Sequence, residues 1–431
     1  MKKILQKILR YLAKRVIKKY QPIIIGITGS VGKSSAKEAV YTVLKNYFDL
    51  RRSLKNYNNE VGLPLTILGR LSPGKSLNGW LRVFWLALGS LWFFEKSYPK
   101  ILLLEMAADR PGDIKYLTEI APCKIGVVTA VAPVHLEFFN DNLENVAREK
   151  SMIVSHLPKN GWAVLNADDE RILAMKEKTE ARILTYGFSE KVEIRAIEPF
   201  IDQEIDSSGR TIIRGINFKV KYAGNTVPFF LSGILAKSQI YAALVGVAIG
   251  LLFDLNLIEI SEALKGYQAL PGRMNLIEGI KESLIIDDTY NSSPKAVEAA
   301  LEVIKEIRID SRSKKWIVLG GMLELGKISQ EAHQEVGRMV GEMNFDYLVT
   351  VGEKAKIIGQ AAKETGMPEK NVFHFNRSEE AGKFLAEKIK KNDLILVKGS
   401  QGVRMEKTVK QIMANPGKAK KLLVRQDEGW L

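Results

Sequence analysis

The segment Thr28-Gly-Ser-Val-Gly-Lys-Ser-Ser35 combines the residue types that bind a nucleotide phosphate. It follows an apolar run that predicts a strand over 22–28 and precedes a predicted helix over 35–47, the context that a phosphate-binding loop requires. Backbone N–H groups at the start of the helix would face the phosphates, Lys33 would neutralise the β- and γ-phosphate oxygens, and Ser34 would offer a hydroxyl to Mg²⁺. The strict G-x-x-x-x-G-K-[ST] pattern is not met, because Ile27 occupies its first glycine position. We therefore expect a variant ATP-binding loop, with these candidate residues: Thr28, Gly29, Ser30, Gly32, Lys33, Ser34 and Ser35.

Three further side chains could serve phosphate chemistry. Glu105 ends a predicted strand over 100–105, where we expect its carboxylate to be exposed at the sheet's edge and to hold Mg²⁺; a surface glutamate is the alternative. His135 follows a predicted strand over 125–131, and a lone histidine is more often a hydrogen-bonded structural residue than a ligand. Lys150 lies in a helical segment, where its pattern alone indicates a solvated lysine.

Composition limits the class of protein that positions these residues. The chain has 431 residues, 46% hydrophobic and 26% charged, which indicates a globular protein of two or three domains. One cysteine, Cys123, excludes a disulfide framework and a cysteine-based zinc site, and four scattered histidines disfavour a His-rich metal site. This cysteine usage fits a reducing cytoplasm.

The pattern of the chain predicts two α/β units. Strands alternate with helices from residue 22, which indicates parallel βαβ units, and a hairpin is expected within 191–232, turning at Gly224-Asn225. The βα alternation restarts after Leu270-Pro271-Gly272. We expect a P-loop central ATPase domain with a mostly parallel sheet and a Rossmann-like α/β domain. The expected limits are 1–20 for a basic helix, 21–270 and 271–431. Other predicted strands and helices cover 162–166, 183–186, 211–222, 227–231, 284–287, 294–307, 316–319, 329–343, 347–351, 378–390 and 394–397.

Two segments could contact a membrane. Residues 1–20 carry eight Lys/Arg and no acid, with apolar residues at helical spacing, which favours a basic amphipathic helix over a secretory signal. The alternative is a helix that docks its apolar stripe on the next domain. Residues 77–94 hold Trp80, Trp85 and Trp92 but are interrupted by Arg82, so we expect either a buried helix or an interfacial aromatic patch, and no span.

Ordered motifs over residues 22–412 resemble the Mur ligase family, and those of the last third resemble its MurF branch, which adds D-alanyl-D-alanine. The variant loop T-G-x-x-G-K-[ST] is similar to the nucleotide loop of these ligases. The other matching segments are Asn56-Tyr-Asn-Asn-Glu-Val-Gly-Leu-Pro-Leu-Thr66, Leu104-Glu-Met-Ala-Ala-Asp-Arg-Pro-Gly-Asp113, Thr129-Ala-Val-Ala-Pro-Val-His-Leu-Glu137, Val146-Ala-Arg-Glu-Lys150, Ala163-Val-Leu-Asn-Ala-Asp-Asp169, Pro271-Gly-Arg-Met274, Asp287-Asp-Thr-Tyr-Asn-Ser-Ser-Pro294, Val318-Leu-Gly-Gly-Met-Leu-Glu-Leu-Gly326 and Val397-Lys-Gly-Ser400.

The resemblance implies an ATP-dependent ligase that joins a carboxylate to an amine through an acyl phosphate. It implies ATP and two Mg²⁺ as cofactors, with Ser34, Glu105, His135 and a Lys150 carbamylated by CO₂ around the metals. It also implies that Arg273 and Asp288 contact ATP and take part in catalysis together with Lys33, His135 and Lys150. Four residues of the matching segments are assigned to substrate binding by resemblance: Asn58, Asn59, Asn291 and Pro294.

Three departures from the family pattern matter. About 20 residues precede the first predicted strand, so we expect the usual N-terminal UDP-binding domain to be missing. The family's His-Asn pair is replaced within Leu231–Ala243, where Lys237, Ser238 or Gln239 could take over adenine contacts. Gly321 stands where the family has an aspartate, which weakens the inference of donor specificity.

We therefore expect a cytoplasmic, MurF-like ligase of peptidoglycan precursor synthesis, acting on a peptide or small-molecule acceptor and an amino acid or dipeptide donor. Peripheral binding to an anionic membrane surface is also expected from the basic N-terminus. The alternatives are a ligase for another acceptor (poly-γ-glutamate, a lipid-linked or a pseudomurein-type peptide) and a P-loop ATPase that binds nucleic acid or membrane. Nucleic acid is disfavoured, because Tyr11 and Tyr20 are the only aromatic residues in 1–20.

Overall fold

The structure is a computed structural model that describes residues 2–54, 57–93, 97–133 and 136–426. The chain divides into two compact units. The first contains residues 1–198, 218–230 and 238–267; the second contains 199–217, 231–237 and 268–431. The domain limits expected at residues 20 and 270 stay a prediction.

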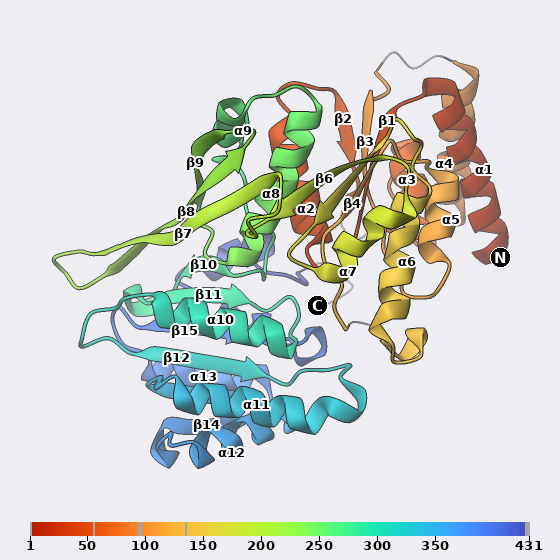
Figure 1. Ribbon diagram of the computed structural model, residues 1–431. Coiled ribbons are helices and arrows are strands. Elements are labelled where there is room, and N and C mark those ends of the chain that lie inside the picture. Colours follow the sequence, from red (N-terminus) through yellow and green to blue (C-terminus); the bar gives the residue numbers. More distant parts are fainter. Residues whose placement is uncertain (1, 55–56, 94–96, 134–135, 427–431) are drawn as a thin grey trace. The chain divides into compact units, whose positions relative to one another are not determined.

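The first unit is built on a mostly parallel sheet (Figure 1). Its strand order is β2-β3-β1-β4-β5-β6, continued by β7-β8-β9, and the pairs from β2 to β7 whose register is defined are all parallel. The strands are β1 (Ile23–Thr28), β2 (Leu50–Arg52), β3 (Ile101–Glu105), β4 (Ile125–Val128), β5 (Trp162–Asn166), β6 (Arg182–Gly187), β7 (Ile194–Ile205), β8 (Thr211–Tyr222) and β9 (Asn225–Ser232).

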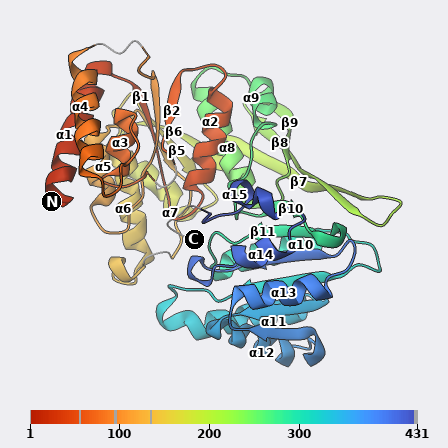
Figure 2. The same cartoon turned by 180° about the vertical axis from the view of Figure 1, so that it is seen from behind.

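Helices cover both faces of this sheet. α2, α8 and α9 lie on one side, and α1, α3, α4, α5 and α6 lie on the other (Figures 1 and 2). The helices are α1 (Lys2–Tyr20), α2 (Lys33–Leu44), α3 (Gly62–Leu68), α4 (Leu77–Trp92), α5 (Asp113–Ile120), α6 (Leu143–Ser155), α7 (Glu170–Leu173), α8 (Lys237–Leu252) and α9 (Leu257–Leu264). No helix among the described residues is long and apolar enough to cross a membrane.

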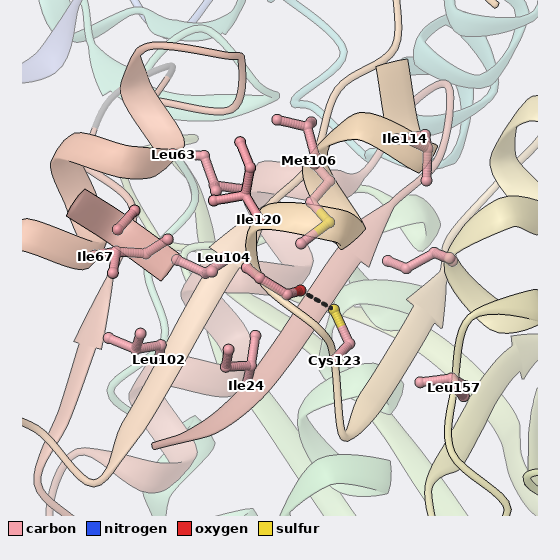
Figure 3. Close-up of a cluster of buried hydrophobic side chains, with 14 of the residues drawn as sticks. Ile24, Leu63, Ile67, Leu102, Leu104, Met106, Ile114, Ile120, Cys123 and Leu157 are labelled. Carbon is pink, nitrogen blue, oxygen red and sulfur yellow. Dashed lines mark hydrogen bonds between the residues drawn. The ribbon is translucent and has the colours of Figure 1, made fainter. Parts of the chain in front are cut away.

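A buried apolar cluster lies under α1, α3, α5 and α6 (Figure 3). It explains why the sequences of β1 and β3 are apolar, since both strands contribute side chains to it. Ile24 of β1 and Leu102 and Leu104 of β3 point into it, because alternate strand residues share a face. Cys123 lies in the same cluster, where its thiol donates to the Ala121 carbonyl at 3.5 Å and burial raises its pKa to about 12. This cysteine is therefore a core residue.

The predicted hairpin is confirmed, with a small change in its turn. β8 and β9 are neighbours joined by Ala223 and Gly224, whose φ angles of 47° and 81° are both positive. Two positive φ values match the tight turn that suits the twist of a hairpin. β7 and β8 are neighbours as well, so β7 is a strand that the sequence pattern did not resolve.

The second unit contains a six-stranded sheet among its described residues, in the order β10-β11-β15-β12-β13-β14. Only β10 pairs antiparallel, with β11; the other pairs are parallel. Its strands are β10 (Asn275–Glu278), β11 (Leu284–Asp288), β12 (Lys315–Gly320), β13 (Tyr347–Val351), β14 (Val372–Phe375) and β15 (Leu394–Lys398). Figure 1 shows α10 and α11 in front of this sheet, and Figure 2 shows α13 and α14 in front of it.

Each face of that sheet has its own apolar cluster, one with α10, α11 and α12 and the other with α13, α14 and α15. This is the doubly wound arrangement that the Rossmann-like prediction requires. The helices are α10 (Pro294–Glu306), α11 (Ser329–Glu342), α12 (Lys356–Glu364), α13 (Ser378–Lys388), α14 (Glu406–Ile412) and α15 (Ala419–Leu422). Short 3-10 helices in the chain are η1 (Leu136–Phe139), η2 (Ala174–Lys178), η3 (Ile280–Glu282), η4 (Gly326–Ile328), η5 (Glu353–Ala355), η6 (Glu369–Asn371), η7 (Gln401–Val403) and η8 (Pro416–Lys418).

Candidate active site

The predicted phosphate loop joins β1 to α2. Two of its glycines have left-handed φ angles, 146° at Gly29 and 83° at Gly32. A Cβ atom on Gly29 would lie 2.1 Å from the Thr129 hydroxyl, so a side chain is excluded there by space as well as by conformation. Gly32 is the N-cap of α2, which begins at Lys33, two residues earlier than predicted. Lys33, Ser34 and Ser35 therefore form the first turn of the helix.

Hydrogen bonds from neighbouring strands hold the loop. Thr28 Oγ1 donates to the Met106 carbonyl at 2.8 Å, and Ser30 N donates to the Ala130 carbonyl at 2.7 Å. Thr129 Oγ1 donates to the Val31 carbonyl at 2.6 Å. No side chain caps the first turn of α2. The N–H groups of that turn are therefore a site where an anion would be stabilised by hydrogen bonds and by the helix dipole.

The Lys33 ammonium lies against its own loop. Its Nζ donates to the Gly29 carbonyl at 2.8 Å and to the Ser30 carbonyl at 3.3 Å. Both acceptors are backbone carbonyls of the loop, so the charge of Lys33 is placed where phosphate oxygens would be bound. Ser30 itself has a buried hydroxyl oxygen without a hydrogen-bond partner in the structure.

Glu105 is buried, which corrects the expectation of an exposed carboxylate. β3 lies between β2 and β1, and Glu105 pairs in register with Ile27, so the residue belongs to the interior of the sheet. Its two oxygens accept from Ser34 Oγ at 2.9 Å and from Asn58 Nδ2 at 3.0 Å. Lys37 Nζ lies 3.3 Å from Glu105 Oε2 and is equally buried, a partner that the motif did not indicate.

Electrostatics keep this carboxylate ionised. Burial by itself would raise the pKa of Glu105, but the charges of Lys37 and Lys33 and the hydrogen bonds from Asn58 and Ser34 outweigh it and lower that pKa. A carboxylate beside a hydroxyl is the hard oxygen donor set that Mg²⁺ prefers, so Glu105 and Ser34 fit the expected metal. No group of three or more His, Cys, Asp or Glu residues suited to a metal occurs in the described part of the chain.

Substitution of Glu105 should destabilise the fold. Glu105→Gln leaves the buried Lys37 ammonium without its carboxylate, and breaking a buried pair from one side costs about 3–5 kcal/mol. Because the pKa of Glu105 is lowered on folding, its ion pair stabilises the protein above pH 4.5 and is lost as pH falls through the folded-state pKa. Chemical denaturation at pH 7 measures the loss. The matched control is Glu180→Gln, whose pair with Lys159 is solvent-exposed and should be worth less than about 1 kcal/mol; equal losses in the two variants would contradict this account.

Lys150 is buried on α6, so the solvated lysine expected from its pattern is wrong. Its Nζ donates to the Ala108 carbonyl at 3.4 Å. Burial lowers the pKa of Lys150 to about 7, and the charge of Lys33 lowers it further, against the opposing charges of Glu149, Asp109 and Asp113. A substantial fraction of this amine is therefore neutral near pH 7, which is the form that acts as a nucleophile.

Glu149, the residue next to Lys150, is a structural anchor that the sequence did not reveal. Its oxygens accept from Gly112 N at 2.8 Å and Ile114 N at 2.7 Å, at the start of α5. A carboxylate at a helix N-terminus satisfies free N–H groups and complements the dipole. This contact ties α6, which carries Lys150, to the loop that follows β3.

The remaining candidate residues of the first unit are Asn58, Asn59 and His135. Asn58 reaches Glu105, whereas Asn59 Oδ1 accepts from Val61 N and Gly62 N at the start of α3. His135 lies outside the described residues. The assignment of both asparagines to substrate, and of His135 to a metal, stays a prediction.

Among the three residues considered for the missing His-Asn pair, Gln239 is buried and is linked to the phosphate-loop helix through Tyr267. Tyr267 Oη donates to Gln239 Oε1 at 2.6 Å and lies 3.4 Å from the carbonyl of Ser35 in α2. Lys237 instead pairs with Glu306 at 3.4 Å, and Ser238 is exposed. Gln239 is thus the one of the three with a described link to the phosphate-loop helix.

In the second unit, two of the predicted site residues, Asp288 and Asn291, contact the buried Lys398. Lys398 Nζ lies 2.6 Å from Asp288 Oδ2 and donates to the Asn291 carbonyl at 3.0 Å. Asp288 Oδ1 accepts from Met274 N at 3.2 Å, and the Arg273 guanidinium stacks 4.1 Å from the Tyr290 ring centre. Asp288 therefore links the ends of neighbouring strands.

Lys398 and Asp287 are residues that sequence reasoning missed. Asp288 and Lys398 are register partners at the ends of the parallel strands β11 and β15, which lie at the point where the strand order reverses. Such crevices at the carboxyl ends of strands bind ligands in open α/β sheets. Asp287 is fully buried and accepts from Thr289 Oγ1 at 2.6 Å; burial raises its pKa to about 7. Pro294 follows as the first residue of α10.

Comparison with known proteins gives a family for this arrangement. The Mur ligase middle domain matches residues 89–249, and the Mur ligase glutamate ligase domain matches residues 272–401, together more than half of the chain. The chain belongs to the Mur ligase family. The phosphate loop lies before the first of these matches.

Several of the similar proteins carry the name of one branch of the Mur ligases. UDP-N-acetylmuramoyl-tripeptide–D-alanyl-D-alanine ligase of Bacillus subtilis is 27% identical over 408 residues, which cover 95% of this Mur ligase and 79% of the relative. The ligase of the same name from Buchnera aphidicola is 29% identical, with 92% and 76% covered. The crystal structure of the MurF ligase from Thermotoga maritima in complex with ADP superposes with a TM-score of 0.75 at 27% identity, covering 94% of this chain and 83% of that one.

Proposed function

We propose that this Mur ligase transfers the γ-phosphoryl group of ATP to an acceptor carboxylate and joins the resulting acyl phosphate to an amine. The carboxylate oxygen attacks the γ-phosphorus and ADP leaves. The amine nitrogen then attacks the acyl carbon, loses a proton, and inorganic phosphate leaves. The observation that carries this proposal is the Glu105–Ser34–Lys33 arrangement beside the glycine loop, in a chain that superposes on an ADP-bound MurF.

The residues of the first unit suit the charge that this reaction develops. Lys33 would neutralise the transferred phosphoryl oxygens, and the N–H groups at the start of α2 would hold the phosphates. Glu105 and Ser34 would hold Mg²⁺, which shields the charge of the β- and γ-phosphates when it is bound. A second Mg²⁺, held by His135 and a modified Lys150, is part of the same proposal by resemblance.

Lys150 is proposed to carry a carbamate. Its neutral amine nitrogen forms a bond to the carbon of CO₂ and releases one proton, which converts the neutral amine into an anionic carbamate. The positive charge of Lys33 disfavours the ammonium of Lys150 and would favour that anion. The buried, weakly basic amine supports this proposal.

Residues of the second unit are also proposed to bind substrates. Arg273 and Asp288 would contact ATP, and Asn291 and Pro294 would border the amino substrate. The Lys398 contacts to Asp288 and to the Asn291 backbone support a shared position for Asp288 and Asn291 at the end of the sheet.

The named relatives supply the proposed substrates, a UDP-N-acetylmuramoyl-tripeptide acceptor and a D-alanyl-D-alanine donor. We expect phosphate release from ATP that requires both acceptor and amine, with the highest rate for this pair. The assay should include poly-γ-glutamate, a lipid-linked peptide and a pseudomurein-type peptide as rival acceptors. Phosphate release that is equal with and without amine would instead indicate an ATPase, and product formed only with a rival acceptor would overturn the acceptor assignment.

A further inference from the structure

α1 has two chemically distinct faces. Four of its residues are buried in the core cluster of the first unit: Leu9, Leu12, Ala13 and Val16. This confirms the alternative in which the helix docks its apolar stripe on the following domain. The opposite face, spaced at helical intervals, is exposed and consists of Lys3, Ile4, Lys7, Ile8, Tyr11, Lys14, Arg15 and Lys18.

α4 exposes many of its apolar side chains to solvent. Of its residues only Val83 and Ala87 are buried, whereas Trp85 is 77% exposed and Trp92 is 81% exposed. The exposed apolar residues recur about once per helical turn and form a stripe along the helix: Leu77, Leu81, Trp85, Leu88 and Trp92. A contiguous apolar stripe of this kind on a surface marks an interaction site.

The two helices present these faces next to each other. α1 and α4 lie side by side in both views (Figures 1 and 2), and both bury their inner residues in the same cluster. Lys19 of α1 donates to the carbonyls of Ser90, Leu91 and Phe93 at 3.0, 2.9 and 2.7 Å, which fixes the end of α4 against α1. Their outer faces therefore point away from one shared core.

The charge of this surface has one sign. Residues 1–20 and 61–93 contain no Asp or Glu. Lys75, which precedes α4, and Arg82, within α4, are both exposed. The acidic residues known to contact α1 lie on other elements: Glu60 accepts from Gln6 Nε2 at 2.7 Å, and Glu119 pairs with Arg10 at 2.7 Å. Five cations on the outer face of α1 thus border an exposed Trp/Leu stripe.

We infer that the outer faces of α1 and α4 together dock on the surface of an anionic lipid bilayer. Lysine and arginine are attracted to anionic headgroups, and tryptophan rings favour the headgroup level. Leucine side chains between the tryptophans would enter the acyl boundary, as in helices that lie in the interface plane. This inference does not rest on the ligase activity, since it concerns binding alone.

Charge also distinguishes the bilayer from other occupants. A second copy of the chain, using the same face, would offer the α1 cations no acidic partner from α1 or α4, because a two-fold interface joins the same patch of both copies and these helices contain no Asp or Glu. A nucleic acid would satisfy the cations but would leave the leucines of α4 without an apolar partner. The lipid surface is the occupant that matches both halves of the face.

Co-sedimentation with vesicles tests the inference on the full chain. We expect binding to vesicles of equal parts phosphatidylglycerol and phosphatidylcholine at low salt, and weak binding to pure phosphatidylcholine. The triple variant Lys7→Glu/Lys14→Glu/Lys18→Glu should lower partitioning at least about 100-fold, because each lysine lost from the surface lowers it about fivefold. The variant Trp85→Ser/Trp92→Ser should also lose binding, and brominated lipids should quench tryptophan emission in the wild type more than in this variant.

Matched controls separate surface charge from net charge. Lys305→Glu/Lys370→Glu/Lys388→Glu changes three exposed lysines of the second unit and should leave vesicle binding within about twofold of wild type. Absence of binding to anionic vesicles at low salt would overturn the inference. If vesicle binding is absent, two results would identify another occupant. A concentration-dependent dimer that Trp85→Ser/Trp92→Ser abolishes would indicate a second copy of the chain. RNA binding that survives this substitution would indicate a nucleic acid.

Discussion

Replacing Lys33 with alanine should lower the rate of acceptor- and amine-dependent phosphate release at least about 100-fold. Loss of one preorganised electrostatic contact to a charged transition state commonly costs about 10²–10³-fold in turnover. The Lys33 ammonium donates hydrogen bonds to the carbonyls of Gly29 and Ser30 in the glycine loop. The transferred phosphoryl group is proposed to bind beside this loop. Single-turnover measurement with saturating ATP separates this loss of chemistry from weaker ATP binding.

The control for this variant lies on the same helix. Lys45, at the end of α2, is exposed, so Lys45→Ala removes the same charge at a distance from the loop and should retain near wild-type turnover. Lys33→Ala also loses two hydrogen bonds to backbone carbonyls, each worth about 1 kcal/mol, so its thermal unfolding must be shown to remain well above the assay temperature. A folded Lys33→Ala enzyme with near wild-type ligation would overturn the assignment of the loop.

The sequence predicted the secondary structure of the loop region well because its signals are local. An apolar run, glycines at the required positions and a polar helix start are all read within a dozen residues. The start of α2 was misplaced by two residues, since Gly32 adopts a left-handed conformation and acts as the N-cap itself. That conformation depends on the contact between the loop and Thr129, which is distant in sequence.

Strand order explains the error at Glu105. A residue at the end of an apolar strand is exposed if the strand lies at an edge and buried if neighbours cover it. The sequence does not show that β3 lies between β2 and β1. Lys37 could have been found, because it follows Ser34 by three residues and therefore shares its helix face. The pairing of Lys398 could not have been found from local spacing. Its partner Asp288 is 110 residues away in sequence, and the two residues lie together only because β11 and β15 pair in register.

The burial of Lys150 did have a signal in the sequence. Val146, Ala147, Ile153 and Val154 are buried on α6, and Lys150 lies at the helical spacing that places it among them. A lysine on the apolar face of an amphipathic helix is a candidate for a shifted pKa. The pattern identifies the buried position. The contributions of Lys33 and of the three nearby carboxylates to the pKa of Lys150 become visible only in the folded structure.

Lys150→Met should therefore change both activity and the pH dependence of stability. In CO₂-depleted buffer the folded chain releases the Lys150 proton near pH 7, whereas the unfolded chain retains it up to about pH 10.5. Between these values the unfolded state binds one more proton, so this group makes the free energy of unfolding rise by about 1.4 kcal/mol per pH unit. The Met variant should lack that contribution, and denaturant titrations from pH 7 to 9.5 measure the difference.

The carbamate itself should be visible with ¹³C-labelled bicarbonate. We expect a carbamate carbon resonance that grows between pH 6 and pH 8, because the neutral amine that reacts with CO₂ accumulates as pH rises through about 7. Lys150→Met should lack this resonance, and Lys159→Met, which removes an exposed lysine of the same unit, should keep it. Lys150→Ala should lose about 100-fold in ligation, by the same electrostatic argument as for Lys33, and acetate should restore part of it by occupying the vacated space as an anion. Absence of the resonance together with absence of rescue would leave Lys150 a buried amine, and the proposed second metal position would lose its anionic ligand.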